Sequence, residues 1–157
     1  SFPFHFGLYM LAGFIALPAA FVLYMLLRPV IGTQTSTDLR AYFGGDAFNA
    51  IHAVTILLYA GFLVPMAEEF LFRGLLFRWL RQRLDFWPAA FISAVLFGLA
   101  HQRTDQMVIA GLLGLPLAWL YEKSRSLAPA ILMHQTYNSL TLMMTFAAVW
   151  FQPEAQS

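Results

Sequence analysis

Of the 157 residues in this chain, 60% are hydrophobic and only 11% are charged, whereas soluble domains average about 25% charged residues. So few charges cannot cover the surface of a water-soluble domain, and we expect lipid to be the solvent. The net charge of +1 and the lack of a Lys/Arg run argue against nucleic-acid binding. The absence of cysteine excludes disulfides, thiolate metal sites and a cysteine nucleophile.

The apolar runs, taken in chain order, predict a helical membrane protein. Residues 5–27 contain no charged residue, and as a helix they would extend roughly 34 Å, enough to cross a core of about 30 Å. Four further candidate spans follow, at 48–66, 87–101, 106–121 and 128–151. Strand alternation and internal repeats are absent from the sequence. The predicted fold class is all-α, a polytopic transmembrane helix bundle of about five to six membrane helices.

Two features divide the chain between these runs. The polar stretch TQTSTD at 33–38 predicts a loop. Pro65 ends the second run, so we expect a kink or a helix restart there, with 66–84 as a separate helix. The loops after the second and fourth spans carry five Lys/Arg, against three in the opposite loops. This bias places the N-terminus in the cytoplasm, in a cytoplasmic (inner) membrane.

The stretch EEFLFR, residues 68–73, places three charges between apolar runs. Charges inside a bilayer are costly and need a partner or a function. Glu69 and Arg73 are four residues apart and can form an ion pair, whereas Glu68 points about 100° away. A structural charge cluster near a helix start and a functional site explain this motif equally well.

Two more polar insertions favour a site. His101 ends the run FGLAH, and His134 and Asn138 are spaced to project from one helical face. Taken singly, His101 is typical of an interfacial histidine and the other two of interhelical hydrogen bonding. Together with Glu68 and Glu69 they offer two carboxylates, two imidazoles and an amide from three separate helices. A bundle could bring these groups to one polar cavity.

The carboxylate, imidazole and amide groups of such a cavity would suit the hydrolysis of an amide bond. The motifs GxSxG and HExxH are absent, which argues against a serine triad and the common zinc-protease helix. A carboxylate and a histidine can hold and deprotonate water, and Glu68 is the better base because Glu69 is expected to pair with Arg73. His134 and Asn138 could donate hydrogen bonds to the oxyanion of a tetrahedral intermediate.

In order, EEFLFR (68–73), FGLAH (97–101) and HQTYN (134–138) resemble the EExxxR, FxxxH and HxxxN motifs of the CPBP family. That family comprises the CAAX proteases and bacteriocin-processing enzymes, including Rce1-like and Abi intramembrane proteases. The resemblance covers roughly residues 50–145. Together with the apolar runs, it predicts three parts of the chain: 1–47, an N-terminal transmembrane helix and loop; 48–151, a CPBP-like catalytic helical core; and 152–157, a polar tail.

The resemblance also implies roles for the matched residues. Glu68 and His101 would activate water, and His134 and Asn138 would stabilise the oxyanion. The other matched positions would support the site: Glu69, Arg73 and Phe97. The family's structural description favours metal-free, glutamate-type catalysis, so no cofactor is expected; zinc held by Glu68, His101 and His134 is the alternative.

The predicted function is an intramembrane endopeptidase. It would hydrolyse a peptide bond of a membrane-anchored or lipidated peptide. The alternative is a non-proteolytic membrane scaffold or an accessory subunit of a larger membrane complex. Membrane lipids are expected partners in either case, and a homo-oligomer or a partner membrane chain is a further possibility.

Overall fold

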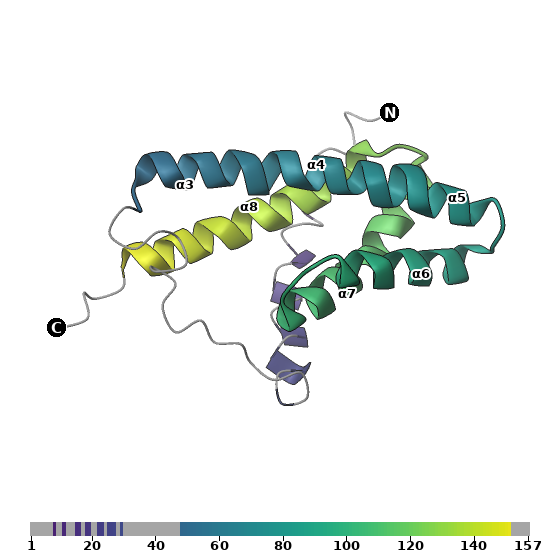
Figure 1. Ribbon diagram of the computed structural model, residues 1–157, viewed down its shortest axis with the longest axis horizontal. Helices are drawn as coiled ribbons and strands as arrows, with labels where there is room; N and C mark the ends of the chain where they lie inside the picture. Colours follow the sequence, from purple (N-terminus) through teal and green to yellow (C-terminus); the bar gives the residue numbers. More distant parts are fainter. Residues whose placement is uncertain are drawn as a thin grey trace.

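The computed structural model describes residues 48–151, together with scattered helical positions between 8 and 29. The expectations for the N-terminal part, 1–47, and for the polar tail, 152–157, otherwise lie outside the described residues. Figure 1 shows the described helices as broad ribbons.

A single long helix, Ala50–Arg81, opens the described part of the chain. It begins after Asn49, whose side-chain oxygen accepts hydrogen bonds from the backbone N–H groups of Ile51 and His52 at 3.0 and 3.2 Å. The predicted separate helix at 66–84 is therefore wrong. Figure 1 shows the labelled parts of this helix in one line. Its parts are α3 (Ala50–Ile56), the π-helical η2 (Leu57–Leu63), α4 (Val64–Glu69), the π-helical η3 (Phe70–Phe77) and α5 (Arg78–Arg81).

Pro65 lies inside this helix without ending it. Proline has no N–H to donate and would crowd the preceding turn of an α-helix. Here the preceding turn is widened, because Val64 N–H donates to the carbonyl of Tyr59, five residues back. In that register, Ala60 would be the acceptor for residue 65. The Ala60 carbonyl instead accepts a hydrogen bond from the side chain of Asn138 at 3.1 Å.

Three further helices complete the described fold: α6 (Phe86–Leu99), α7 (Thr104–Ser124) and α8 (Ala128–Trp150). They lie within a few residues of the runs at 87–101, 106–121 and 128–151, so these helices are confirmed. Residues 48–151 contain no strand. The all-α class is therefore confirmed for the described part of the chain.

One described helix, Ala50–Arg81, is long and apolar enough to cross a membrane. Its 32 residues would extend up to about 48 Å. That is more than the hydrocarbon core of about 30 Å. The helix α6 is apolar but has only 14 residues. The number of membrane helices therefore stays a prediction.

The helices α6 and α7 approach each other closely at two glycines. A Cβ at Gly98 would lie 2.5 Å from the carbonyl oxygen of Met107. A Cβ at Gly114 would lie 2.7 Å from the Cα of Ala94. Neither position can carry a side chain without a shift of backbone, so these glycines set the distance between the two helices.

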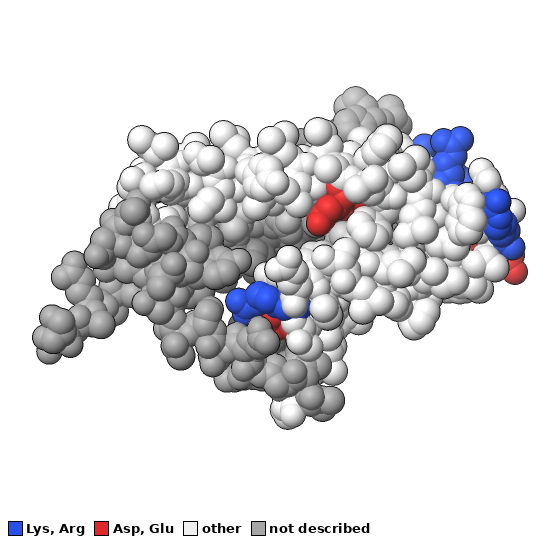
Figure 2. Space-filling model, in the orientation of Figure 1, with Lys and Arg blue, Asp and Glu red and all other residues white. Residues whose placement is uncertain are grey.

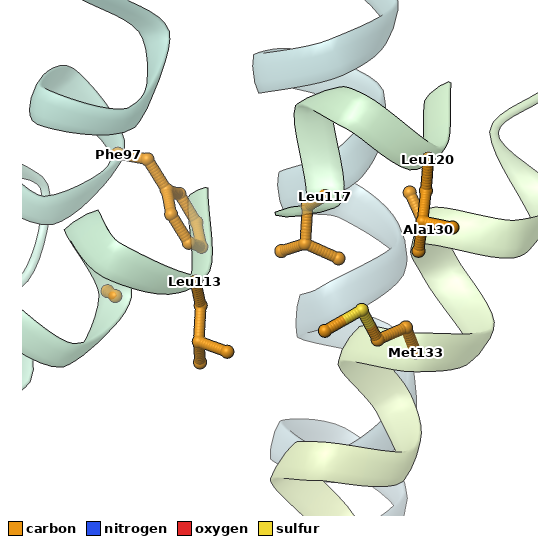
Figure 3. Close-up of a cluster of buried hydrophobic side chains, with 7 residues drawn as sticks. Phe97, Leu113, Leu117, Leu120, Ala130 and Met133 are labelled. Carbon is orange, nitrogen blue, oxygen red and sulfur yellow. The ribbon is translucent and has the colours of Figure 1, made fainter. Parts of the chain in front are cut away.

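A buried apolar cluster joins α6, α7 and α8. Figure 3 shows it from close by, with Met133 of α8 facing Leu117 of α7. Its buried members are Phe97, Ala110, Leu113, Leu117, Leu120, Ala130 and Met133. Phe97 is the first residue of the FGLAH motif, and Met133 directly precedes the HQTYN motif. This packing therefore holds the polar residues of α6 and α8 in place.

Candidate active site

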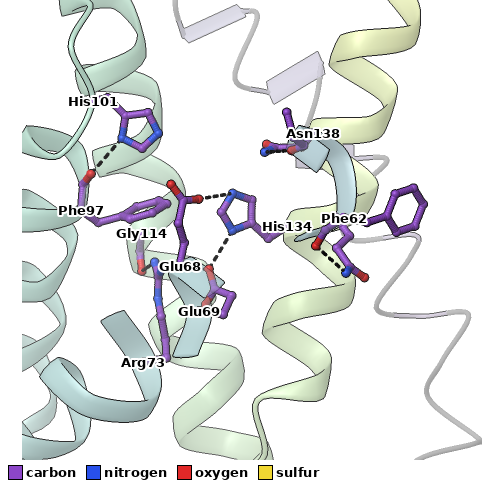
Figure 4. A network of polar contacts seen from close by, with 11 residues as sticks. Phe62, Glu68, Glu69, Arg73, Phe97, His101, Gly114, His134 and Asn138 are labelled. Atoms are coloured by element: carbon purple, nitrogen blue, oxygen red, sulfur yellow. Dashed lines mark hydrogen bonds and ion pairs between the residues drawn. The ribbon is translucent and has the colours of Figure 1, made fainter. Parts of the chain in front are cut away.

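The predicted ion pair between Glu69 and Arg73 is present and fully buried. Nη1 of Arg73 lies 2.8 Å from Oε1 of Glu69, and both side chains are 0% exposed. Nη2 of Arg73 also donates to the carbonyl oxygen of Gly114 at 3.2 Å. The guanidinium thus joins the long helix to α7, as Figure 4 shows. Sequence reasoning missed this acceptor, since nothing local to Arg73 points to Gly114.

Phe97 lies at the centre of the cluster. The Arg73 guanidinium carbon is 4.5 Å from the centroid of its ring, a cation–π distance. His101 and His134 both meet the ring edge-on, at centroid distances of 5.3 and 5.6 Å. One ring therefore contacts a cation and both histidines, and the supporting role of Phe97 stays a prediction.

His134 lies between the two carboxylates. Its Nδ1 is 2.8 Å from Oε1 of Glu69, and its Nε2 is 3.6 Å from Oε2 of Glu68. A carboxylate paired with Arg73 can only accept hydrogen bonds, so we assign the Nδ1 proton of His134 to the bond with Glu69. The ring is thereby fixed in orientation, and its Nε2 is directed toward Glu68 (Figure 4).

Glu68 diverges from Glu69, as the helical geometry predicts. Its side chain is 24% exposed, whereas that of Glu69 is fully buried. Glu68 also interacts electrostatically with both His134 and His101. The adjacent carboxylates therefore have different environments, one buried against a cation and the other partly open beside two imidazoles.

His101 lies just beyond the end of α6. Its Nδ1 is 3.0 Å from the carbonyl oxygen of Phe97. A carbonyl oxygen accepts, so Nδ1 carries the proton of this bond, and in the neutral ring Nε2 is an acceptor. The turn after α6 thus presents an imidazole whose second nitrogen is available for a water molecule or a substrate.

Two side chains of α8 hold the widened turn ahead of Pro65. Asn138 donates to the Ala60 carbonyl, and Gln135 Nε2 donates to the carbonyl of Phe62 at 3.0 Å. Sequence reasoning assigned Asn138 to the oxyanion and missed Gln135. Pro65 was the available signal, because a helix-internal proline leaves a backbone carbonyl in need of another donor.

A cavity of about 490 Å³ opens beside this cluster. His101, His134 and Asn138 are part of its wall, and Arg103 and Asp105 also line it. The rest of the lining is mostly apolar and comes from the long helix, α6, α7 and α8. Glu68 is not part of this wall and meets the site through its contact with His134. The predicted convergence on one polar cavity therefore includes both histidines and the amide.

The zinc alternative requires three ligand side chains grouped around one point. Within residues 48–151, no three His, Asp or Glu side chains are grouped closely enough to hold a metal ion. Glu68, His101 and His134 therefore do not fit a three-ligand zinc site in this arrangement.

The fold and the site of residues 48–151 together form an all-helical core with a carboxylate–histidine centre beside a cavity. Residues 50–140 match the family described as Type II CAAX prenyl endopeptidase Rce1-like, and the chain belongs to this family. The resemblance drawn from the three motifs is therefore confirmed.

A curated relative from Bacillus subtilis (strain 168), named "Putative membrane peptidase YdiL", is 28% identical over 110 residues. The match covers 69% of this chain and 45% of the relative, so the chain spans less than half of that protein's length. No solved structure matches the chain significantly. The family and the relative support a protease function in general and a location in a membrane.

Proposed function

We propose that the protein is a glutamate-type intramembrane endopeptidase. It hydrolyses a peptide bond of a membrane-anchored or lipidated peptide without a metal ion. The observation that carries the proposal is the position of His134, held by Glu69 on one nitrogen and facing Glu68 with the other. Such an arrangement leaves Glu68 partly exposed and outside the buried ion pair, as a general base requires, and leaves Nε2 of His134 as the nitrogen that can face an oxyanion.

In this mechanism Glu68 is the general base. The water molecule lies between Glu68 and His101, whose Nε2 accepts one of its hydrogen bonds. Glu68 takes a proton as the water oxygen attacks the carbonyl carbon of the peptide bond, and later returns that proton to the leaving amine. Glu69 cannot replace Glu68 as the base, because its carboxylate is ion-paired with Arg73 and hydrogen-bonded to His134.

His134 and Asn138 stabilise the oxyanion that forms. Because Nδ1–H of His134 is directed to Glu69, only Nε2 can face the substrate, and it donates when the ring carries both protons. Asn138 has two amide protons and uses one on Ala60. The second is available to the oxyanion, and the side chain lines the cavity. A donor of this kind contributes about 3–4 kcal/mol to the transition state.

The cavity and the expected membrane setting support the proposed substrate class. The mostly apolar wall accepts an extended, apolar peptide segment delivered from the bilayer. We further propose that the full protein is a bundle of five to six membrane helices in the inner membrane, with a cytoplasmic N-terminus. Completion of the bundle by a second copy or by a partner membrane chain belongs to the same proposal.

The experiment is a cleavage assay with purified protein in liposomes. The substrates are a library of membrane-anchored peptides, with and without an attached lipid. We expect cleavage of at least one lipid-anchored member by the wild type and none by Glu68→Gln. A folded wild-type protein that cleaves no member, and that instead co-purifies with another membrane chain, would support the accessory-subunit alternative.

A further inference from the structure

A second hollow lies on the opposite side of the long helix from the buried ion pair. It is lined by Leu71, Gly74, Leu75, Leu76, Arg78, Trp79 and Gln82, and we call it the α5 groove. It has a volume of about 550 Å³. Most of its members follow one another at helical spacings of three and four, so they share one face of η3 and α5. None of the proposed catalytic residues lines it.

The groove is apolar along most of its length. Leu71 and Leu75 are 54% and 53% exposed. Between them, Gly74 has no side chain, and a Cβ there would meet only the side chains of Leu127 and Phe70, at 3.5 and 3.7 Å. The groove is therefore shallow at Gly74, with apolar side chains on either side. Such a groove fits an alkyl chain.

The groove ends among polar and aromatic side chains. Trp79, 51% exposed, lies at this end together with Arg78 and Gln82. Tryptophan and arginine at the end of a membrane helix are typical of the headgroup level of a bilayer. Figure 2 shows Lys and Arg gathered at the end of the molecule where α5 lies in Figure 1. This end of the protein therefore favours negatively charged lipid headgroups.

Arg78 differs from its neighbouring arginines. Arg81 donates to both carboxylate oxygens of Glu122, and Arg83 donates to the Trp79 carbonyl and stacks over the Trp79 ring at 4.2 Å. The side chain of Arg78 forms no hydrogen bond or ion pair with any residue that the structure describes. A guanidinium has five N–H donors. Those of Arg78 are therefore available to an anionic group at the end of the groove.

We propose that the α5 groove binds one anionic phospholipid. The acyl chain lies along Leu71, Gly74 and Leu75, and the phosphate receives hydrogen bonds from Arg78, with Trp79 at the level of the headgroup. An apolar helix of a partner chain would bury Arg78 without an acceptor, which is costly in a membrane. Charge complementarity therefore favours the lipid over a second helix.

The test is native mass spectrometry of the full chain with an equimolar mixture of phosphatidylglycerol and phosphatidylcholine. One arginine near the surface favours the anionic lipid by about fivefold, so we expect that preference in the wild type and its loss in Arg78→Gln. Arg125→Gln is the matched control, because it removes the same charge from an arginine that already pairs with Glu122, the partner of Arg81, and does not line the groove. Equal effects of the two substitutions, or a preference retained in Arg78→Gln, would overturn the proposal.

Two further measurements test the path of the acyl chain and whether the bound phosphate belongs to a lipid or to a small soluble molecule. Gly74→Leu fills the groove and is expected to weaken binding of both lipids, while the thermal unfolding midpoint shows that the protein remains folded. Unchanged lipid binding in folded Gly74→Leu would contradict the assigned path of the chain. Glycerol 3-phosphate in excess should leave the lipid bound, and displacement by it would overturn a lipid as the occupant.

Discussion

One carboxylate oxygen, Oε1 of Glu69, accepts from both Nη1 of Arg73 and Nδ1 of His134, each at 2.8 Å. A single buried oxygen thereby connects the ion pair of the long helix to the histidine of α8. The position of His134 depends on this oxygen, and so does the neutralisation of Arg73. Loss of the Glu69 charge should therefore affect stability and site geometry together.

Glu69→Gln leaves Arg73 buried without a counter-charge. Removing one partner of a buried pair costs about 3–5 kcal/mol, so we expect the free energy of unfolding in detergent to fall by that amount. Glu68→Gln is the matched control, since its side chain is partly exposed and forms no ion pair with an arginine among the described residues. Equal unfolding free energies for the two variants would contradict the assigned roles of the two glutamates.

The contact between α6 and α7 gives a second prediction. Gly114→Ala places a Cβ 2.7 Å from the Cα of Ala94, so the helices must separate. Overpacking of this kind costs about 1–3 kcal/mol, measured by unfolding in detergent. At Gly111 a Cβ would be 3.6 Å from the nearest atom outside its own helix. Gly111→Ala should therefore be nearly neutral, and a larger loss there than at Gly114 would count against this packing.

A double-mutant cycle tests the hydrogen bond that replaces the missing N–H of Pro65. Asn138→Leu leaves the Ala60 carbonyl without its donor, at a cost of about 1–3 kcal/mol. In a Pro65→Ala background the backbone N–H of residue 65 can donate to the Ala60 carbonyl. Asn138→Leu should therefore lower the free energy of unfolding by less in that background. The measurement is the free energy of unfolding of the four proteins. Additive effects would show that Asn138 does not compensate for Pro65.

These cases show what the sequence could and could not predict. The Glu69–Arg73 pair and the main helices follow from local spacing and from apolar runs, which depend on residues close in sequence. The continuity of the helix through Pro65 depends on donors more than 70 residues away, on α8, and no local pattern reveals them. The contact of His134 with both glutamates is likewise set by tertiary packing.

The proposed metal-free mechanism makes a prediction for chelators. Because Glu68, His101 and His134 are not grouped as metal ligands in the described part of the chain, we expect cleavage to be unchanged after dialysis against a strong chelator. The measurement is the initial rate before and after dialysis. An activity lost on dialysis and restored by zinc would require a rearranged site with these residues as ligands.

The most direct test of the account is the cleavage rate of Glu68→Gln in liposomes, compared with wild type. Glu122→Gln is the control, because it removes a carboxylate that pairs with Arg81 and Arg125 away from the site. Loss of a general base lowers the rate by roughly 10²–10⁴-fold, so we expect a fall of that size in Glu68→Gln and near wild-type rates in Glu122→Gln. Wild-type cleavage by a folded Glu68→Gln protein would contradict the central claim.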